Sequence, residues 1–167
     1  MNKDILRKYL EIRSIKDLKE SKCPDKKYTL NLIENKDFQL NKFLYKQIGK
    51  KYHWIDRLEW TDQKWIDYVS NKGLLTFVLQ NKEDVVGYFE LLVHYNKKEI
   101  EIAYLGILEE YHNKKLGSYL LSEAIKISFK NNVNRVWVHT CSLDHKNALN
   151  NYISRGMKIF KTENLNI

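Results

Sequence analysis

The residues best suited to chemistry form a short loop, His112–Ser118, between a segment of strand character and one of helix character. The first N–H groups of a helix have no partner within the helix, and the helix dipole adds partial positive charge there. Lys114 and Lys115 bring two further positive charges. This combination predicts a site for a phosphate-bearing ligand. The alternative is that both lysines belong to an ordinary solvated loop.

A second group that could do chemistry is a pair of carboxylates ahead of the loop. Glu99 and Glu101 alternate with Ile100 and Ile102. Because successive side chains of a strand point to opposite faces, the two carboxylates share one face. A half-buried carboxylate beside apolar neighbours has a raised pKa and can accept a proton near neutral pH. The alternative is a solvated strand face.

Hydrophobic periodicity predicts the elements that position these groups. Leu116–Phe129 repeats apolar residues at steps of about four, which indicates an amphipathic helix with one buried face. Ahead of the loop, β-branched and aromatic runs separated by polar pairs are typical of antiparallel strands in a meander. The three predicted strands are Leu74–Gln80, Val85–Tyr95 and Ile100–Leu108.

Further elements are predicted on both sides of this central part. The upstream ones are a strand at Tyr28–Glu34, a helix at Asp37–Lys50, and a helix from Thr61-Asp62 that ends before Asn71-Lys72-Gly73. The downstream ones are a strand at Arg135–Leu143, a helix with Asp144 as N-cap and Gly156 as its end, and a strand at Met157–Lys161.

This order of elements predicts an α/β fold with helices on the faces of one mixed sheet. The crossover through Leu116–Phe129 requires the strands on either side of it to run parallel. The length of 167 residues suits a single domain spanning the chain. We expect residues 1–27 to form an N-terminal extension packed on that domain, with strand character at Tyr9–Ile15.

Composition narrows the classes of function. The formal charge of +8 suits a polyanionic partner, but the chain contains no nucleic-acid-binding motif. Cys23 and Cys141 have no metal-binding spacing, and the first ten residues contain no apolar run. We therefore expect a cytoplasmic protein without a metal, a nucleic-acid partner or a membrane partner. A homodimer is compatible with the sequence.

Two segments resemble ordered motifs of one enzyme family. The loop His112-Asn113-Lys114-Lys115-Leu116-Gly117 resembles Gln/Arg-x-x-Gly-x-Gly/Ala, with His112 and Lys115 as departures. His145–Met157 resembles Asn-x-x-Ala-x-x-x-Tyr-x-x-x-Gly-Phe, departing at both ends, and Val136–His145 resembles the run Val-His-Thr-Cys-Thr-Leu-Asp-His. Over Leu74–Glu163 the chain thus resembles the GNAT N-acetyltransferases, and in particular a bacterial subgroup of unassigned acceptor.

The resemblance implies a fold, a co-substrate and a set of binding residues. The fold is a mixed, mostly antiparallel central sheet with a parallel splayed pair and helices on both faces. The co-substrate is acetyl-CoA, and the acceptor is a primary amine of a small molecule or peptide. The residues implied in acetyl-CoA binding are Leu105, Gly106, Ile107, His112, Asn113, Lys114, Lys115, Leu116, Gly117, Ser118, His145 and Asn147.

The resemblance also implies catalytic roles. Glu101 lies eleven residues before His112, the spacing of the general-base Glu in the histone-acetylating branch, which implies Glu101 as base. Tyr152 is implied as the general acid for the leaving thiolate, with a core tyrosine as the alternative.

His139 and Cys141 are interpreted as packing residues. The aromatic group around the first helices either lines an acceptor pocket or packs the helices on the sheet; it comprises Tyr52, His53, Trp54, Trp60 and Trp65. The alternative function is a non-catalytic acyl-CoA sensor.

Overall fold

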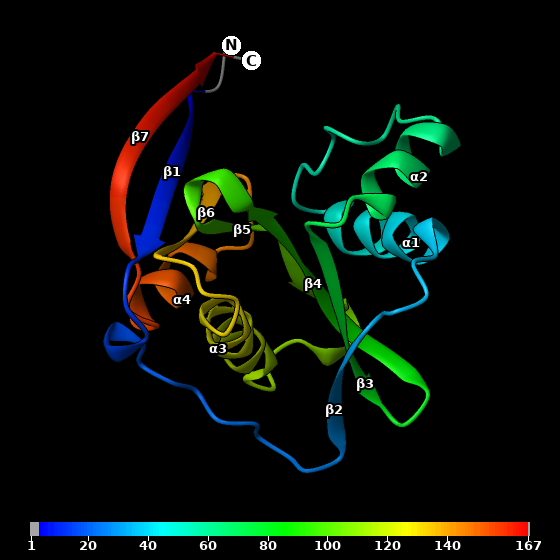
Figure 1. Cartoon of the computed structure of the whole chain (residues 1–167), viewed down its shortest axis with the longest axis horizontal. Helices are drawn as coiled ribbons and strands as arrows, with labels where there is room; N and C mark the ends of the chain where they lie inside the picture. Colours follow the sequence, from blue (N-terminus) through cyan, green and yellow to red (C-terminus); the bar gives the residue numbers. More distant parts are fainter. Residues whose placement is uncertain (1–3, 167) are drawn as a thin grey trace.

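The computed structural model describes residues 4–166, which build one seven-stranded sheet between helices (Figure 1). The sheet order is β2-β3-β4-β5-β6-β1-β7. The strands are β1 (Asp4–Ile12), β2 (Tyr28–Leu32), β3 (Leu74–Asn81), β4 (Asp84–His94), β5 (Glu99–Ile107), β6 (Arg135–Cys141) and β7 (Lys158–Asn166). Every neighbouring pair is antiparallel except β5 and β6. The predicted meander and the parallel pair are therefore confirmed.

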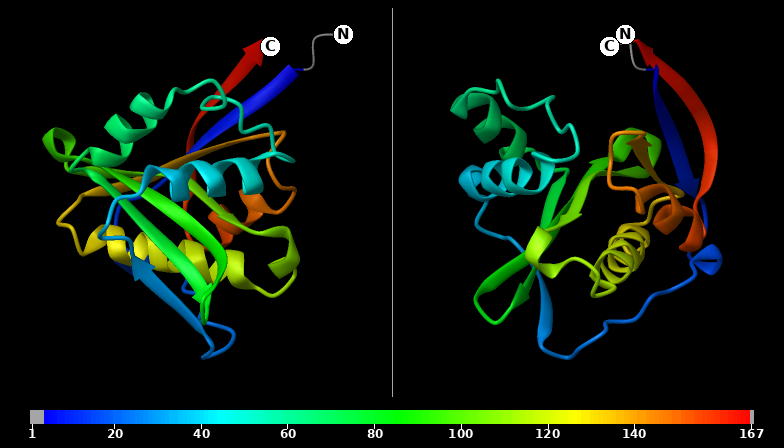
Figure 2. Two further views of the ribbon diagram at one scale, coloured as in Figure 1. Left: turned by 90° about the vertical axis from the view of Figure 1, so that its right-hand side faces the viewer. Right: turned by 180° about the vertical axis from the view of Figure 1, so that it is seen from behind.

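Helices cover both faces of the sheet, as predicted (Figure 2). The helices α1 (Phe38–Gly49) and α2 (Asp62–Ser70) lie on one face, and α3 (Leu116–Phe129) and α4 (Ala148–Ser154) lie on the other. Side-chain caps start the first two helices: the Asp37 carboxylate accepts from the Gln39 N–H at 2.9 Å, and the Thr61 hydroxyl accepts from the Lys64 N–H at 3.2 Å. Such caps satisfy N–H groups that a helix leaves free at its start.

The main core lies between the sheet and α3. Ile100, Ile102 and Val136 are almost fully buried on the strand side, and Leu120 and Ala124 are fully buried on the helix side. Glu99 and Glu101 alternate with these isoleucines and lie on the opposite face. The sequence periodicity of α3 thus places its apolar stripe on the sheet.

The parallel pair separates along its length. Only Glu99, Ile100 and Glu101 of β5 pair with β6. From Ile102 to Ile107, β5 is paired on its β4 side alone. The register between β4 and β5 shifts here, because Glu90 pairs with Tyr104 whereas Leu91 pairs with Ile102. Such a bulge bends a strand, and it accompanies the opening of the sheet.

The N-terminal residues correct the expectation of an extension packed on the domain. Strand β1 occupies an interior position of the sheet, antiparallel to both β6 and β7. It spans Asp4–Ile12 rather than Tyr9–Ile15, and Ile5, Leu10 and Ile12 are buried. The strand β7 extends to Asn166, beyond the predicted end at Lys161, because it pairs along nearly all of β1.

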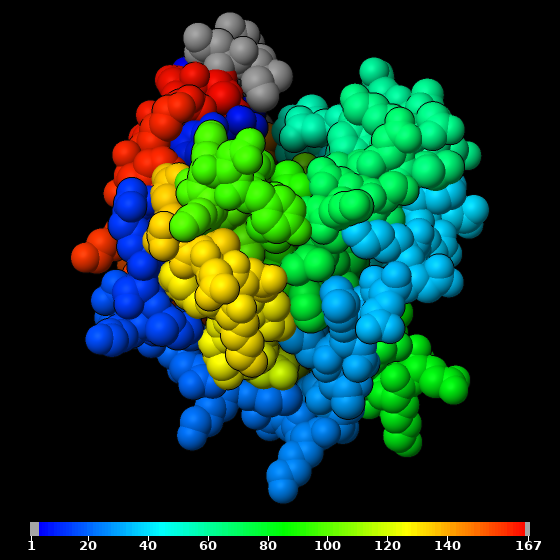
Figure 3. Space-filling model, viewed as in Figure 1, coloured from blue at the N-terminus to red at the C-terminus, as the bar shows by residue number. Residues whose placement is uncertain are grey.

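The segment that follows β1 runs along α3 before it enters β2. The Ser21 N–H donates to the Ser122 hydroxyl at 2.8 Å, and the Lys126 ammonium contacts the Glu20 carboxylate at 2.8 Å. Figure 3 shows this segment, in blue, beside the end of α3 and the residues after it, in yellow. These contacts fasten the start of the chain to the same helix that opens at the predicted anion site.

Candidate functional site

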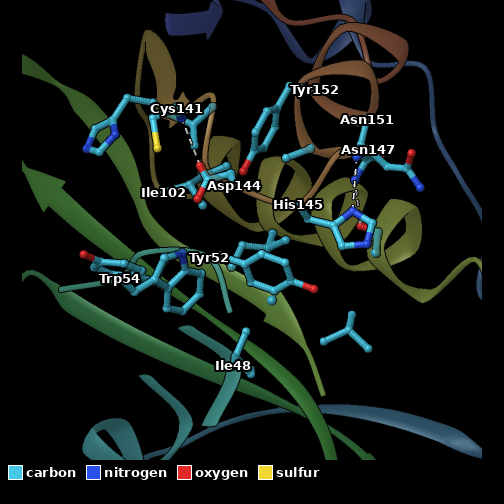
Figure 4. Close-up of a pocket in the computed structure, with 18 of the residues that line it drawn as sticks. Ile48, Tyr52, Trp54, Ile102, Cys141, Asp144, His145, Asn147, Asn151 and Tyr152 are labelled. Carbon is cyan, nitrogen blue, oxygen red and sulfur yellow. Dashed lines mark hydrogen bonds between the residues drawn. The ribbon is translucent and has the colours of Figure 1, made fainter. Parts of the chain in front are cut away.

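A cavity of about 510 Å³ opens where β5 and β6 separate. Its walls come from the end of α1 and the following connection on one side, and from the end of β6, the loop after it and α4 on the other. Figure 4 shows the first wall as Ile48, Tyr52 and Trp54, and the second as Cys141, Asp144, His145, Asn151 and Tyr152. The cavity runs from the start of α3 past Tyr152 to residues of β1 and β6.

The first turn of α3 forms one end of the cavity. Leu116, Gly117 and Ser118 line it, and the N–H groups of a first helical turn have no partner within the helix. Lys115 precedes this turn in the left-handed conformation, with φ 60° and ψ 18°, and its side chain makes no cap hydrogen bond. A residue that commonly is Gly in the motif thus has the backbone that Gly adopts most readily.

Most of the loop between β5 and α3 lies at the cavity. His112, Asn113 and Lys115 line the cavity, and an imidazole nitrogen of His112 lies 2.9 Å from the carbonyl oxygen of Ile107. Lys114 does not line the cavity, because its ammonium lies over the Tyr111 ring, 5.4 Å from the ring centroid. Its contribution to an anion site is limited to its charge at longer range.

The β6–α4 loop brings a second histidine to the same end. The rings of His112 and His145 meet edge to face with centroids 5.4 Å apart. Burial, then the charges of His112 and Lys146, lower the pKa of His145. The Asn147 N–H donates to Nδ1 of His145 at 3.1 Å, so this nitrogen is an acceptor. The neutral ring closes the cavity beside the first turn of α3.

The middle of α4 is tied to the start of α3, and the role of Asp144 beside it differs from the sequence prediction. The Asn151 amide donates to the Gly117 carbonyl at 3.2 Å. Asp144 is not the N-cap of α4, which begins after Asn147. Its carboxylate instead accepts from the Thr140 hydroxyl at 2.5 Å and the Cys141 N–H at 3.1 Å. An Asp turn of this kind competes with helix capping for the same side chain.

The unpaired side of β5 forms the floor of the cavity. Leu105, Gly106 and Ile107 line it, and their backbone groups have no β6 partner. A Cβ atom at Gly106 would lie 2.5 Å from Cγ2 of Ile48, so α1 itself requires glycine at this position. The glycine thus serves the close contact of helix and strand in addition to leaving the floor open.

Tyr152 projects from α4 into the middle of the cavity (Figure 4). The residue is 8% exposed. Burial, with the Asp144 carboxylate as the smaller cause, raises the pKa of its phenol above the ordinary value of 10.0. The phenol therefore stays protonated through the neutral range and can donate a hydrogen bond.

Glu101 lies outside the cavity lining. Its carboxylate faces His94, with 3.3 Å between Oε2 and Nε2. Glu101 pairs with Trp137 across the parallel strands, which places it behind the point at which the strands open. The predicted base is therefore set back from the cavity.

Several ionisable side chains that the sequence analysis did not place in the site line the same cavity, among them Arg7 of β1, Asp56 of the α1–α2 connection, and His139 of β6. Burial, then the Arg7 guanidinium, lower the pKa of His139, while Glu101, Asp144 and Asp56 oppose the shift. The imidazole is therefore neutral at pH 7 and has a free lone pair. In the sequence, only the alternation of side chains along β6 indicated the face of the sheet to which His139 points.

An aromatic cage holds the connection that carries Asp56. The Arg57 guanidinium contacts the Glu90 carboxylate at 3.0 Å and lies between five aromatic rings. The ring centroids are 4.1 to 5.5 Å from its central carbon and belong to Tyr45, Trp60, Trp65, Tyr68 and Tyr104. Two of these, Trp60 and Trp65, belong to the aromatic group singled out in the sequence, and they pack the helices. Tyr52, His53 and Trp54 of that group line the cavity.

The cavity suits a long ligand with phosphates at one end. Free N–H donors and Lys115 lie at the α3 end, an unpaired strand edge forms the floor, and a protonated phenol lies midway. Among residues 4–166, no group of three or more Cys, His, Asp or Glu side chains is placed to hold a metal ion. Within the same residues, no helix is both long and apolar enough to cross a membrane.

Comparison with known proteins agrees with this description. A sequence model of the acetyltransferase (GNAT) family matches residues 35–157. A GCN5-related N-acetyltransferase from Sphaerobacter thermophilus is similar in structure, with a TM-score of 0.70 and 13% identity over 96% of this chain and 50% of that one. A second, from Kribbella flavida, has a TM-score of 0.67 and 13% identity over 95% and 58%. No curated protein matched.

A third similar structure is an aminoglycoside acetyltransferase from an uncultured soil metagenomic sample, with a TM-score of 0.63 and 15% identity over 78% of this chain and 88% of that one. The chain spans about half the length of the Sphaerobacter protein. At these identities the structural likeness shows the fold alone.

The splayed mixed sheet and its cavity define an acetyltransferase fold. The family match covers well over half of the chain, so the chain belongs to the GNAT acetyltransferase family.

Proposed function

We propose that the protein transfers an acetyl group from acetyl-CoA to a primary amine of a small molecule or peptide. The observation that carries the proposal is a single continuous cavity. It connects the free N–H donors of α3, the unpaired edge of β5, the Tyr152 phenol and the neutral His139 ring. Acetyl-CoA would supply the activated acetyl thioester.

The residues of this chain would bind the two ends of the co-substrate differently. The first turn of α3, with Lys115 and His112, would hold the phosphates through backbone N–H groups and charge. The β5 edge from Leu105 to Ile107 would pair with an extended chain as an added strand does. Backbone N–H groups at this edge could also donate to a polarised carbonyl oxygen.

Two proton transfers are needed, and the cavity offers one group for each. Removing a proton from an ammonium acceptor requires a base, and His139 is neutral and lines the cavity. Tyr152 would donate to the thiolate, because its phenol remains protonated. Glu101, the base implied by the family resemblance, is set back against His94 and raises the pKa of His139. The geometry thus favours His139 as the group that meets the acceptor.

The acyl-CoA sensor remains the contrasting function, since it would use the same binding end without proton transfer. Calorimetry with acetyl-CoA tests the binding that both functions require. Release of free thiol in the presence of an amine panel tests transfer. Binding with thiol release is the expected result; binding without thiol release from any amine would favour the sensor, and no binding would contradict both.

A substitution at Gly117 makes the binding test specific. A Cβ atom there would meet no atom closer than 3.9 Å, so a Cβ atom fits the folded chain, and the branched side chain of Gly117→Val would fill the approach to the first turn of α3. We expect acetyl-CoA affinity to fall at least about tenfold, the loss of one or two phosphate hydrogen bonds. Lys114→Ala, outside the lining, is the control and should keep its affinity within about threefold, as a surface charge does. Unchanged melting temperatures would show that both variants fold.

The acceptor of similar proteins gives limited guidance. Three of the similar structures are of aminoglycoside acetyltransferases, one of them in complex with sisomicin. An aminoglycoside carries several positive charges, whereas this chain has a formal charge of +8 and presents Arg7 in the cavity. Like charges oppose binding of such a ligand. An amine acceptor with fewer positive charges is therefore favoured.

A further inference from the structure

Arg7 is the feature of the cavity that acetyl transfer does not explain. Among the described residues that line the cavity, it supplies the only guanidinium. Its Nε atom is buried and has no hydrogen-bond partner within residues 4–166. None of the ion pairs formed by those residues includes Arg7. A partly buried cation that makes no close ion pair is costly, and a ligand with a negative charge would offset this cost.

The strand register places Arg7 beside the proposed base. Arg7 pairs with Cys141, and Tyr9, two residues on, pairs with His139. Arg7 and His139 therefore lie on the same face of adjacent strands, one step apart along the strand. The influence of the Arg7 charge on the His139 ring agrees with this short separation. An acceptor nitrogen at His139 would thus have its neighbouring substituent within reach of Arg7.

The surroundings of Arg7 indicate the chemical character of the ligand. Ile5 and Leu165, which pair across β1 and β7, line the cavity next to it and are apolar. Asp56 lies in the opposite wall and can attract an ammonium group. This arrangement provides one positive and one negative side chain, as a ligand carrying both an amine and an acid requires.

We infer that the acceptor carries a carboxylate close to its amine, as amino acids and acidic peptides do, and that Arg7 binds this carboxylate. A guanidinium presents a planar fork of donors that matches the two oxygens of a carboxylate. The inference rests on the proposed acetyl transfer for its position in the reaction. It goes further by naming the class of acceptor and the residue that selects it.

The test compares ligands that differ only in the acid group. A panel of N-acetyl amino acids and the matching N-acetyl amino-acid carboxamides is titrated into the protein by calorimetry, so the readout does not depend on turnover. For at least one side chain, the acid should bind about 10- to 100-fold more tightly than the amide, as expected for a charge-assisted hydrogen-bonded pair. Equal affinities for all pairs, or no binding by any ligand of the panel, would overturn the inference.

Variants of Arg7 assign the preference to this side chain. Arg7→Gln should reduce the acid-to-amide ratio to about twofold or less, and Arg7→Lys should retain part of it because charge persists without the fork. Lys8→Gln is the matched control, since Lys8 is the next residue of β1 and points to the other face. A ratio lowered equally by Lys8→Gln would reflect net charge and overturn the role of Arg7.

The same variants separate this inference from the proposed function. Acetyl-CoA affinity should be unchanged in Arg7→Gln; a loss there would reassign Arg7 to the phosphates of the co-substrate. In thiol-release assays with amino acids as acceptors, Arg7→Gln should raise KM more than it lowers kcat, because it removes ground-state binding. Absence of thiol release in every assay, with the acid preference intact, would refute the transfer reaction but leave the Arg7 site standing.

Discussion

Lys115 occupies a position where side-chain type and backbone geometry conflict. It has φ 60°, a left-handed conformation that costs roughly 1 kcal/mol for a residue with a Cβ atom. The related motif commonly has Gly here, and this chain keeps the geometry while adding a positive charge at the start of α3. The strain therefore accompanies an electrostatic gain for an anionic ligand.

Replacing Lys115 by Gly should stabilise the folded protein while weakening the anion site. Relief of the left-handed strain favours the variant, and the greater freedom of glycine in the unfolded chain opposes it, leaving a gain of about 0.5 kcal/mol. Urea denaturation measures this change. Lys114→Gly is the matched control: Lys114 lacks positive φ, so that variant should lose about 0.5 kcal/mol instead. Destabilisation of the same size in both variants would contradict the argument from strain.

The protonation of His139 should set the acid limb of the pH profile. Burial and the Arg7 charge lower the pKa of His139 below the ordinary value of 6.5. The ring is therefore unprotonated, and able to act as a base, down to a lower pH than an ordinary histidine. We expect kcat/KM to fall as pH drops through this lowered pKa. In His139→Gln the limb should disappear and the rate fall about 100-fold or more, the usual contribution of a general base.

Two further variants show whether the limb belongs to His139. Tyr152→Phe should lower kcat about tenfold yet keep the acid limb, because its phenol has a raised pKa and does not titrate there. Glu101→Gln should lower activity less than His139→Gln, since Glu101 faces His94 outside the cavity lining. An acid limb that survives in His139→Gln but is lost in Glu101→Gln would restore Glu101 as base.

At the scale of elements, the connection between α1 and α2 is held by its buried charge pair. Arg57 is 5% exposed and Glu90 is 0% exposed. Besides the ion pair, the Tyr68 hydroxyl donates to Glu90 at 2.8 Å and the Asn41 amide donates to it at 2.9 Å. The pair thus joins α1, α2, β4 and the connection that carries Asp56. This network holds Arg57, the residue next to Asp56, and the turn in which the Leu58 N–H donates to the Ile55 carbonyl adds to it.

Arg57→Met should destabilise the protein by about 3–5 kcal/mol, because it leaves the Glu90 carboxylate buried without its partner. The double variant with Glu90→Met should recover part of the loss, since no charge remains buried. Chemical denaturation measures both. Lys64→Met removes another cation, which lies 5.0 Å over the exposed side of the Trp60 ring, and should cost less than about 1 kcal/mol. A similar loss in Arg57→Met and Lys64→Met would contradict the role of the buried pair.

Local patterns were sufficient to predict most elements. The predicted helix Leu116–Phe129 has the observed bounds, because its apolar stripe is contiguous in sequence. The motif at His112 likewise located one end of the cavity. Arg7, Asp56 and His139 could not be placed in the site, because only the sheet order and the α1–α2 connection bring them together. Their sequence neighbourhoods carry no pattern that distinguishes them from surface or core residues.

At the scale of the whole molecule, the position of β1 is what local patterns could not show. Its nine residues include the charged Arg7, Lys8 and Glu11, which interrupt the apolar alternation expected of a buried strand. Its partners, β6 and β7, lie more than a hundred residues away along the chain. The strand β1 therefore lies inside the sheet, beside the last strand β7 (Figure 1), and places Arg7 at the cavity.

Hydrogen exchange distinguishes an interior strand from an attached extension. The amides of β1 donate in turn to β6 and to β7, whereas β7 has a partner on one side only. The β7 amides that point away from β1, here called the outward amides, should therefore exchange by local fraying. The amides of Arg7 to Leu10 should exchange only when much of the sheet opens. We expect at least about 100-fold slower exchange in β1, equivalent to about 2.7 kcal/mol. If the β1 amides exchanged as fast as the outward amides of β7, the N-terminal segment would be a peripheral attachment, and neither the sheet order nor the placement of Arg7 in the cavity would hold in solution.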